Sequence, residues 1–309
     1  MSLTAPLPRL TAGGIELDTG PEAFGFLRDS SDVAHDPVAL HARMEEDGYL
    51  YLPGFLDRED VRDVRRRICD VLAEEGLLDP TLPSEDAIAA SDAKVAFRPD
   101  IVSRGAPREA LERVIYGDRV MAFYSDFLGG EAAHFDYTWL RAVAPGKGTY
   151  PHCDVVFMGR GTKNLYTAWV PLGDVPLEAG GLIVVEGSHK DEATRQGYAT
   201  MDVDTVCENK PGSNPLKEAG LPGFGELGSD MRAVRNRLGG RILTAKEFRM
   251  GDLLTFSVYT VHGSLDNGSN QIRLSSDSRY QLASEPMDER WVGENPPGHG
   301  GNSVRGLIC

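Results

Sequence analysis

Apolar residues recur at two different spacings along this chain, and the spacing changes near residue 130. Before that point, apolar positions three and four residues apart predict helices. The predicted helices run from 37 to 46 after the N-cap Asp36, from Asp57 to just before Gly76, and from about 107 to 129. An apolar run at 49–52 predicts one early strand. Residues 1 to about 35 are rich in Gly, Pro, Asp and Ser, which predicts an irregular arm.

After residue 130 the apolar runs are short and separated by turn residues, a pattern typical of strands. The predicted strands are 132–143, 154–158, 165–172, 181–186, 242–248, 252–257 and 272–282. Short strands in series favour a closed β sandwich or barrel over βαβ repeats. We therefore expect a mainly β domain over 36–285, a jelly roll with flanking helices. The polar, Gly/Pro-rich stretch at 190–240 is expected to be a lid-like insertion, and 286–309 a C-terminal tail.

The charge balance limits the class of partner. The chain has 32 basic and 47 acidic side chains, for a net charge of -15. Such a surface repels phosphate backbones and anionic lipids, so we expect a small-molecule substrate and neither nucleic acid nor a membrane. The four cysteines form no Cys-x-x-Cys pair, which argues against a disulfide framework or a thiolate zinc site. With no visible signal peptide or apolar span, a cytoplasmic location is expected.

Three His-x-Asp triplets are candidates for metal binding, at 134–136, 152–154 and 189–191. On a strand, residues two apart project from the same face, so each triplet offers two ligands. The first is expected inside a continuous strand, where polar groups are satisfied locally, and the third in a turn that leaves a strand. The second follows a Gly-rich entry and lies at the mouth of an expected strand. By itself, this triplet fits a structural role as well as a metal site.

Residues further along the chain favour the metal interpretation. His262 lies between a β-branched residue and Gly263, and Arg273 is flanked by apolar residues in an expected strand. A buried arginine requires an anionic partner, and its planar guanidinium grips a carboxylate with two hydrogen bonds. Ser264 can add a third. Two imidazoles and one carboxylate are the ligand set that holds ferrous iron and leaves positions open for oxygen chemistry.

In the order and spacing of these motifs, the sequence resembles the phytanoyl-CoA dioxygenase family of iron(II)- and 2-oxoglutarate-dependent oxygenases. The resemblance runs from about Tyr49 to Ala283. It rests on 47–56, Pro145-Gly146, the 152–154 triplet, 168–172, 178–182, 186–190, Gly251-Asp252, 262–264 and Arg273. The match selects His152 and Asp154 as the iron pair and places His189 in the family's post-strand turn.

The resemblance implies a double-stranded β-helix with helices on one side. The implied iron(II) ligands are His152, Asp154 and His262. Arg273 and Ser264 would hold the distal carboxylate of 2-oxoglutarate, with O₂ as the second cosubstrate.

Two further positions have two interpretations each, and a third departs from the family pattern. Trp169 matches a position that lines the cosubstrate in some family members, and it is equally suited to the core. Lys94 lies at a spacing where some members use a lysine on the cosubstrate, or it is a solvated surface lysine. Cys153 stands where members often carry glutamine, which puts one cosubstrate hydrogen bond in doubt.

The implied activity is hydroxylation of an unactivated C–H in a small metabolite of secondary metabolism, with release of succinate and CO₂. Related halogenases replace the aspartate ligand with a small residue, so Asp154 favours hydroxylation. The alternatives are desaturation, epoxidation or rearrangement with the same cofactors, or a non-catalytic metal-binding jelly roll. The basic residues that an acyl-CoA would require are interpreted as a solvated face.

Overall fold

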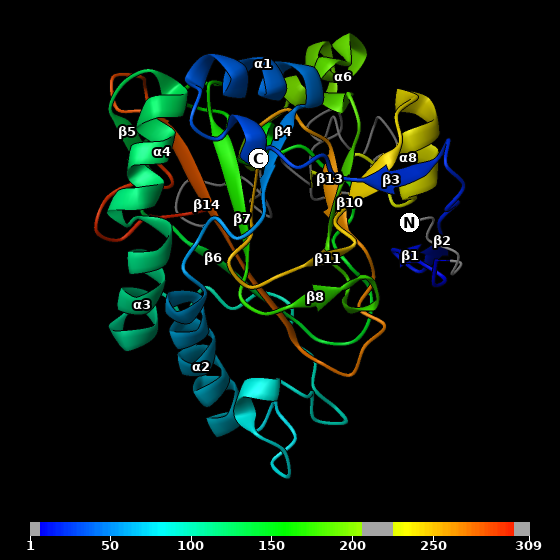
Figure 1. The fold of residues 1–309 in the computed structure, drawn as a ribbon, viewed down its shortest axis with the longest axis vertical. Helices are drawn as coiled ribbons and strands as arrows, with labels where there is room; N and C mark the ends of the chain where they lie inside the picture. The colour runs from blue at the N-terminus through cyan, green and yellow to red at the C-terminus, as the bar shows by residue number, and fades with distance from the viewer. Residues whose placement is uncertain (1–6, 206–224, 300–309) are drawn as a thin grey trace.

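Two β-sheets face each other at the centre of the molecule, and helices cover the outer face of the larger sheet (Figure 1). The computed structural model describes residues 7–205 and 225–299. The larger sheet has the strand order β4-β12-β7-β14-β5, and β6 also pairs with β14. The smaller sheet has the order β13-β9-β10-β3. This arrangement is the jelly roll that the succession of short strands predicted.

The larger sheet consists of β4 (Tyr49–Leu52), β12 (Leu253–Ser257), β7 (Tyr166–Pro171), β14 (Arg273–Leu282), β5 (Ala132–His134) and β6 (Trp139–Val143). The smaller sheet consists of β13 (His262–Ser264), β9 (Leu182–Val185), β10 (Ile242–Thr244) and β3 (Phe24–Phe26). Two strand pairs lie outside these sheets: β1 (Thr11–Ala12) with β2 (Ile15–Glu16), and β8 (Val175–Pro176) with β11 (Glu247–Phe248). The α-helices are α1 (Pro37–Asp47), α2 (Arg58–Glu74), α3 (Gly105–Ile115), α4 (Asp118–Leu128), α5 (Val155–Met158), α6 (Glu192–Gln196) and α8 (Met231–Leu238).

The first two helices begin where their capping residues predicted. The Asp36 side chain accepts hydrogen bonds from the backbone at the start of α1, and Asp57 does the same for α2. Gly48 ends α1 in a left-handed conformation (φ 79°) that glycine adopts without strain. The apolar stripe of α2 packs in the core between the helices and the larger sheet; it consists of Val61, Val64, Ile68 and Leu72.

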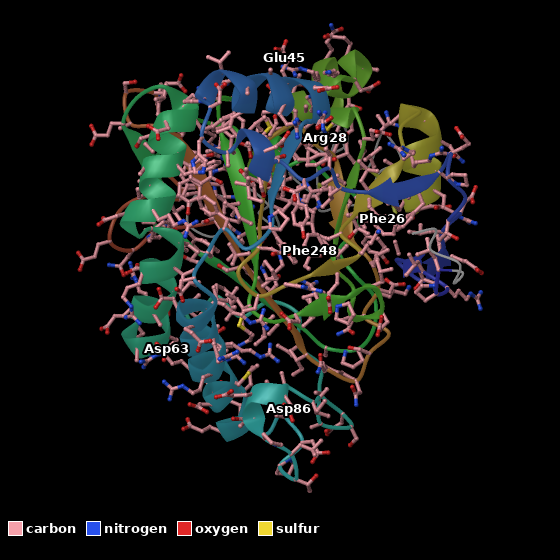
Figure 2. The ribbon with its side chains drawn as sticks, viewed as in Figure 1. Phe26, Arg28, Glu45, Asp63, Asp86 and Phe248 are labelled. Carbon is pink, nitrogen blue, oxygen red and sulfur yellow. The ribbon has the colours of Figure 1, made fainter. Side chains whose placement is uncertain are left out.

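Alternate residues of the larger sheet serve two different cores. In β4, Leu50 and Leu52 contact the helix layer, whereas Tyr49 and Tyr51 point into the space between the sheets. Phe248, labelled in Figure 2, packs edge-on against Tyr51 in this inner space. Because both faces of the sheet are covered, every residue of β4 is buried.

The long central strand β14 has a polar inner face. Its outward residues, such as Leu274 and Tyr280, pack on the helix layer. The inward positions are buried and polar, and they are Arg273, Ser275, Asp277, Arg279 and Gln281. A buried polar row on one strand indicates a lined site rather than a packed core.

Several predicted elements have different bounds in the structure. The helix expected at 107–129 is two helices, α3 and α4, which are separated at Gly117, where a Cβ would lie 2.3 Å from the Arg113 carbonyl oxygen. The prediction of a strand at 154–158 was wrong, because the structure has the single helical turn α5 there. A short buried apolar run suits either a strand or a helix, so the sequence pattern did not separate them. The run at 132–143 divides into β5 and β6, and 242–248 divides into β10 and β11.

The N-terminal arm is not wholly irregular, because β3 pairs in parallel with β10. In the 190–240 insertion, the described part includes α6 and α8. Helix α8 packs through Met231 and Val234 on a third apolar core, which also contains Ile183, Val185 and Ile242. Residues 206–224 of that insertion lie outside the described residues. None of the described helices has both the length and the apolar character needed to traverse a lipid bilayer.

Candidate metal centre and cosubstrate cleft

The two candidate histidine ligands lie side by side because their backbones pair. The His152 amide donates to the His262 carbonyl at 2.9 Å, and the His262 amide donates to the His152 carbonyl at 3.0 Å. This antiparallel bridge joins the end of the Gly-rich entry to the start of β13 and places the ring centroids 4.2 Å apart. Asp154 follows at the start of α5, where its helical backbone (φ -64°, ψ -25°) turns the carboxylate toward both rings. All three side chains are buried.

The hydrogen bonds of the two imidazoles fix which nitrogen faces the site. Nδ1 of His152 lies 2.8 Å from the Tyr150 carbonyl oxygen, and Nδ1 of His262 lies 3.0 Å from that of Thr260. A carbonyl oxygen only accepts, so each Nδ1 carries the proton and each Nε2 presents a lone pair. Both Nε2 atoms converge on Oδ1 of Asp154, at 3.6 and 3.7 Å. Within the described residues, this is the group of three ligand atoms close enough to share one metal ion.

The site also holds Asp154 and His262 in the protonation states that a divalent metal requires. Burial alone would raise the pKa of Asp154, but Arg279 and the two imidazoles hold that pKa well below its usual value. Burial and the neighbouring His152 lower the pKa of His262 to about 4. Near neutral pH, Asp154 is therefore ionised and His262 is neutral, and these are the metal-binding forms.

A narrow cleft leads from the two histidines to a buried arginine that lacks an anionic partner. Arg273 donates from Nη1 to the Ser275 hydroxyl at 2.8 Å, and its Nε has no partner. Across the described ranges 7–205 and 225–299, no carboxylate forms an ion pair with it. Burial lowers its pKa to about 10, and Arg141 adds to that effect. An unpaired buried guanidinium is costly, so this position is suited to a bound carboxylate.

The walls of the cleft combine apolar side chains with hydrogen-bond donors. They are formed by Arg141, Thr149, His152, Trp169, Leu182, His262, Gly263, Ser264, Arg273 and Asp277. Ser264 accepts a hydrogen bond from the Thr149 amide at 2.8 Å, which leaves its hydroxyl proton free to donate. A Cβ on Gly263 would lie 2.7 Å from the Thr149 carbonyl oxygen, so only glycine permits this close approach.

A second, larger cavity adjoins the histidine–aspartate group and shares Arg141, Thr149 and His152 with the cleft. Its volume is about 420 Å³, and Asp154 and His152 are part of its wall. The remaining wall residues are Phe97, Trp139, Arg141, Gly148, Thr149, Tyr150, Phe157, Met158, Glu226, Arg279 and His299. The candidate metal centre therefore lies between a narrow cleft that ends at Arg273 and a wide cavity whose wall combines aromatic and charged side chains.

Comparison with protein families agrees with this geometry. The family model described as phytanoyl-CoA dioxygenase matches residues 44–275, well over half of the chain. The chain belongs to this family. The resemblance inferred from the motifs is thereby confirmed, and so are the iron(II) and 2-oxoglutarate cofactors that it implied. As a family member, the protein is a 2-oxoglutarate-dependent non-haem iron dioxygenase.

Two curated relatives of this protein are hydroxylases from Streptomyces species. The 1-deoxypentalenic acid 11-beta-hydroxylase of Streptomyces arenae is 27% identical over 275 residues, which are 85% of this chain and 87% of that protein. Its counterpart from Streptomyces exfoliatus is 27% identical over 268 residues, 83% of this chain and 85% of that protein. In both cases the similarity covers more than four fifths of each chain.

Solved structures with similar folds support the jelly-roll assignment. The α-ketoglutarate-dependent carbocyclase SnoK of nogalamycin biosynthesis has a TM-score of 0.55 at 17% identity, over 85% of this chain and 89% of that chain. EctD from S. alaskensis with bound Fe also has a TM-score of 0.55 at 17% identity, over 96% of this chain and 93% of that chain. At this level of identity, the likeness shows the fold alone.

The other residues singled out from the sequence have varied positions. Trp169 is buried in the wall of the cleft, where it packs edge-on against Phe248. Lys94 is exposed and lines neither cavity, so its suggested contact with the cosubstrate stays a prediction that the structure does not support. The Cys153 side chain lies in the same third core as Met231 and Val234, where its thiol donates to the Tyr259 carbonyl at 3.3 Å.

Four buried or half-buried residues of the site were not singled out from the sequence. Arg141 lines both cavities, and its Nε donates to Asp277 at 2.7 Å. Thr167 and Arg279 contact the Asp154 carboxylate. The run of polar residues from Arg273 to Gln281, interrupted only by Leu274 and Tyr280, is the signal that points to Asp277 and Arg279.

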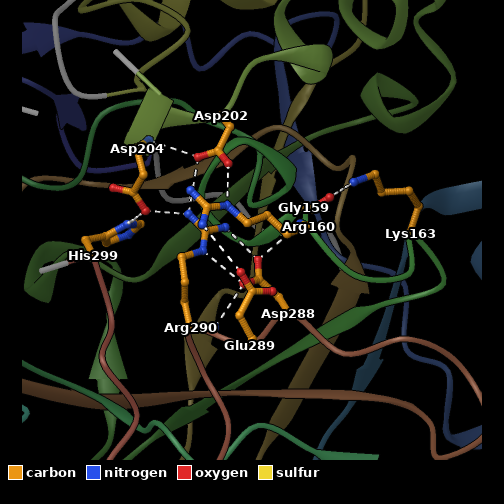
Figure 3. A network of polar contacts seen from close by, with 9 residues as sticks. All are labelled: Gly159, Arg160, Lys163, Asp202, Asp204, Asp288, Glu289, Arg290 and His299. Atoms are coloured by element: carbon orange, nitrogen blue, oxygen red, sulfur yellow. Dashed lines mark hydrogen bonds and ion pairs between the residues drawn. The ribbon is translucent and has the colours of Figure 1, made fainter. Parts of the chain in front are cut away.

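A network of ion pairs and hydrogen bonds connects the segment after β14 to the described part of the 190–240 insertion (Figure 3). The network lies beside the wide cavity. Arg290 donates to Asp202 at 3.2 Å and to Asp288 at 2.6 Å, and it also contacts Asp204. His299, which lines the cavity, lies 2.8 Å from Asp204. The network therefore holds residues 202–204 and 288–299 together at one side of the wide cavity.

Proposed function

We propose that this protein hydroxylates an unactivated C–H of a small, largely apolar metabolite, using iron(II), 2-oxoglutarate and O₂. The observation that carries the proposal is the position of His152, Asp154 and His262 between two cavities of different chemistry. One cavity ends at the guanidinium of Arg273, which has no carboxylate partner among the described residues, and the other is wide, with aromatic and charged side chains in its wall.

Each residue of the cleft has a proposed role. The Nε2 atoms of His152 and His262 and the ionised carboxylate of Asp154 would hold iron on one face. Iron, when bound, supplies the oxidation of 2-oxoglutarate to succinate and CO₂ and the transfer of one oxygen atom to the substrate. Arg273 and Ser264 would hold the distal carboxylate of 2-oxoglutarate. Trp169 and Leu182 would exclude water from its carbon chain.

The wide cavity supports an apolar substrate that carries an anionic group. Phe97, Trp139, Tyr150 and Phe157 offer surfaces for a carbon skeleton. Arg141 uses its Nε for Asp277, and no described residue accepts a hydrogen bond from its two terminal nitrogens. A carboxylate of the substrate would pair with those nitrogens and orient one C–H toward the metal. The two curated relatives are named for an acid, which agrees with this proposal.

The remaining features of the proposal concern the setting of the activity. We propose that 36–285 act as one oxygenase domain, with the 190–240 insertion as a lid over the wide cavity. The net charge of -15 supports a protein that works without nucleic acid or a membrane surface, in the cytoplasm.

Succinate formation tests the reaction class directly. The protein is reconstituted with Fe(II), ascorbate and 2-oxoglutarate and is incubated with 1-deoxypentalenic acid and a panel of other apolar acids. We expect substrate-stimulated succinate formation and a product heavier by one oxygen atom. A product lighter by two hydrogens indicates desaturation instead, and unchanged mass indicates rearrangement. Iron-loaded protein that forms no succinate under any of these conditions, even slowly without substrate, would contradict the proposed activity.

A further inference from the structure

The two oxygens of the Asp154 carboxylate have different surroundings. Oδ1 faces the Nε2 atoms of His152 and His262, at 3.6 and 3.7 Å. Oδ2 faces away from them and accepts two hydrogen bonds, one from the Thr167 hydroxyl and one from Nη2 of Arg279 at 3.0 Å. One oxygen is therefore available to a metal, while the other is already occupied by two donors.

These two donors belong to the rigid centre of the larger sheet. Thr167 on β7 and Arg279 on β14 are direct cross-strand partners, so their side chains project from the same face. Both are almost completely buried, with 1% and 2% of their surface exposed. The guanidinium of Arg279 also lies over the Trp139 ring, 4.0 Å from its centroid. The pair is thus held in place by the strand register and by packing.

We propose that Thr167 and Arg279 are positioning residues that restrict Asp154 to binding the metal through Oδ1 alone. This inference rests on the proposed function, because it concerns the same iron site. A carboxylate can bind a metal through one oxygen or both. The reaction requires three open positions on the metal, two for 2-oxoglutarate and one for O₂, and a second Asp154 oxygen would occupy one of them.

A purely structural role for the same contacts has a different consequence. If Thr167 and Arg279 only compensate the charge of a buried carboxylate, their loss weakens the fold and leaves metal coordination unchanged. If they fix the direction of Oδ1, their loss weakens metal binding and changes the geometry of the bound metal. Partners of this kind typically alter metal affinity by about 10- to 100-fold. The two roles are therefore separable by measurements on the metal.

Thr167→Val is the sharper variant because it removes the hydroxyl donor and keeps the shape of the side chain. The metal-free protein is titrated with Co²⁺, whose visible absorption reports coordination number and geometry. We expect the Co²⁺ dissociation constant to rise roughly 10-fold and the absorption to weaken as coordination number increases. Thr167→Ser restores the hydroxyl and is expected to restore both the affinity and the spectrum. Thermal unfolding of each metal-free variant reports the structural contribution separately.

Arg279 variants test the second donor. Arg279→Lys keeps the charge without the fixed geometry of the guanidinium, and Arg279→Met removes both. We expect Co²⁺ affinity to fall in both variants, and further in Arg279→Met. Arg279→Met leaves the buried Asp154 charge without this partner, which puts the variant at risk of misfolding. If it does not fold, the Thr167 variants test the positioning role. Ser276→Ala is the matched control: Ser276 is buried on the opposite face of β14, its hydroxyl has no partner, and its loss should leave Co²⁺ binding unchanged.

The outcomes separate this inference from the proposed function. If Thr167→Val and Arg279→Lys fold and bind Co²⁺ with the affinity and spectrum of the unaltered protein, the positioning role is overturned while the metal site stands. An equal loss of affinity in Ser276→Ala also overturns it, because the effect is then a general loosening of the strand. If the unaltered protein binds no Co²⁺ and forms no succinate, the proposed function itself fails.

Discussion

Replacing Asp154 with alanine is expected to abolish succinate formation and to weaken binding of divalent metal by more than about 100-fold, the upper end of the loss found for the outer partners of metal ligands. The reason is that Asp154 is the only anionic ligand in the group that the described residues form, so its loss removes both a donor atom and the negative charge that attracts the ion. It also leaves Arg279 without its carboxylate partner. Co²⁺ titration of the metal-free protein and a succinate assay measure the two effects.

The other His-x-Asp triplets provide matched controls for this experiment. Asp136 accepts a hydrogen bond from the Gly293 amide at 2.6 Å, and Asp191 caps the start of α6. Asp136→Ala and Asp191→Ala remove the same side chain from the same sequence pattern, and both are expected to retain metal affinity and succinate formation. If Asp154→Ala still binds Co²⁺ as tightly as these controls do, the metal lies elsewhere.

The histidines of these rival triplets explain why the pattern alone left the choice open. His134 stacks on the Tyr116 ring with centroids 3.6 Å apart, and its Nδ1 lies 3.0 Å from the Phe135 carbonyl oxygen. His189 contacts the Glu45 carbonyl oxygen through Nε2 at 2.9 Å. Each ring is thus held by neighbours that sequence spacing does not reveal, although the buried Nδ1 of His189 has no hydrogen-bond partner. Only the pairing of 152 with 262, over one hundred residues away, distinguishes the remaining triplet.

Local signals predicted the parts of the fold that local interactions determine. The helices capped by Asp36 and Asp57 form as expected because the capping side chains and the apolar stripes act within a few residues. The segment 154–158 was predicted as a strand because its β-branched residues suit one. Its helical turn depends on contacts with distant residues, such as the bond from the Val155 amide to the Val258 carbonyl at 3.1 Å. In this segment, tertiary contacts determine the local structure more strongly than the intrinsic β propensity of its residues does.

The chemistry of the site was predictable where the residue type itself is costly to bury. Arg273 stood out because an arginine between apolar residues requires an anion, and the structure places it at the end of the cleft. Thr167 gave no such signal, because a threonine in a strand is ordinary. Its contact with Asp154 follows from the register between β7 and β14, which only the folded structure supplies.

Replacing Arg273 with methionine is expected to stabilise the ligand-free protein and to abolish its response to 2-oxoglutarate. The buried guanidinium has no carboxylate partner among the described residues, so its removal should raise the free energy of unfolding by about 1–3 kcal/mol. The same change should remove about 2–5 kcal/mol of binding free energy for 2-oxoglutarate, because the distal carboxylate loses its charged partner. Thermal unfolding with and without 2-oxoglutarate, in the presence of Co²⁺, measures both effects.

Arg43→Met supplies the contrasting control, because Arg43 is a buried arginine whose bonds are satisfied. It donates to the Asp29 carbonyl at 3.0 Å and to Asp32 at 3.3 Å, on a helix outside both cavities. Its loss is expected to lower stability and to leave the 2-oxoglutarate response intact, the opposite pattern to Arg273→Met. In the unaltered protein, the carboxylate of bound 2-oxoglutarate offsets the free-energy cost of burying Arg273 without a partner. At a 2-oxoglutarate concentration one hundred times its dissociation constant, binding should stabilise the protein by about 2.7 kcal/mol. If Arg273→Met instead destabilises the ligand-free protein and still responds to 2-oxoglutarate, the arginine is structural and the cosubstrate binds elsewhere.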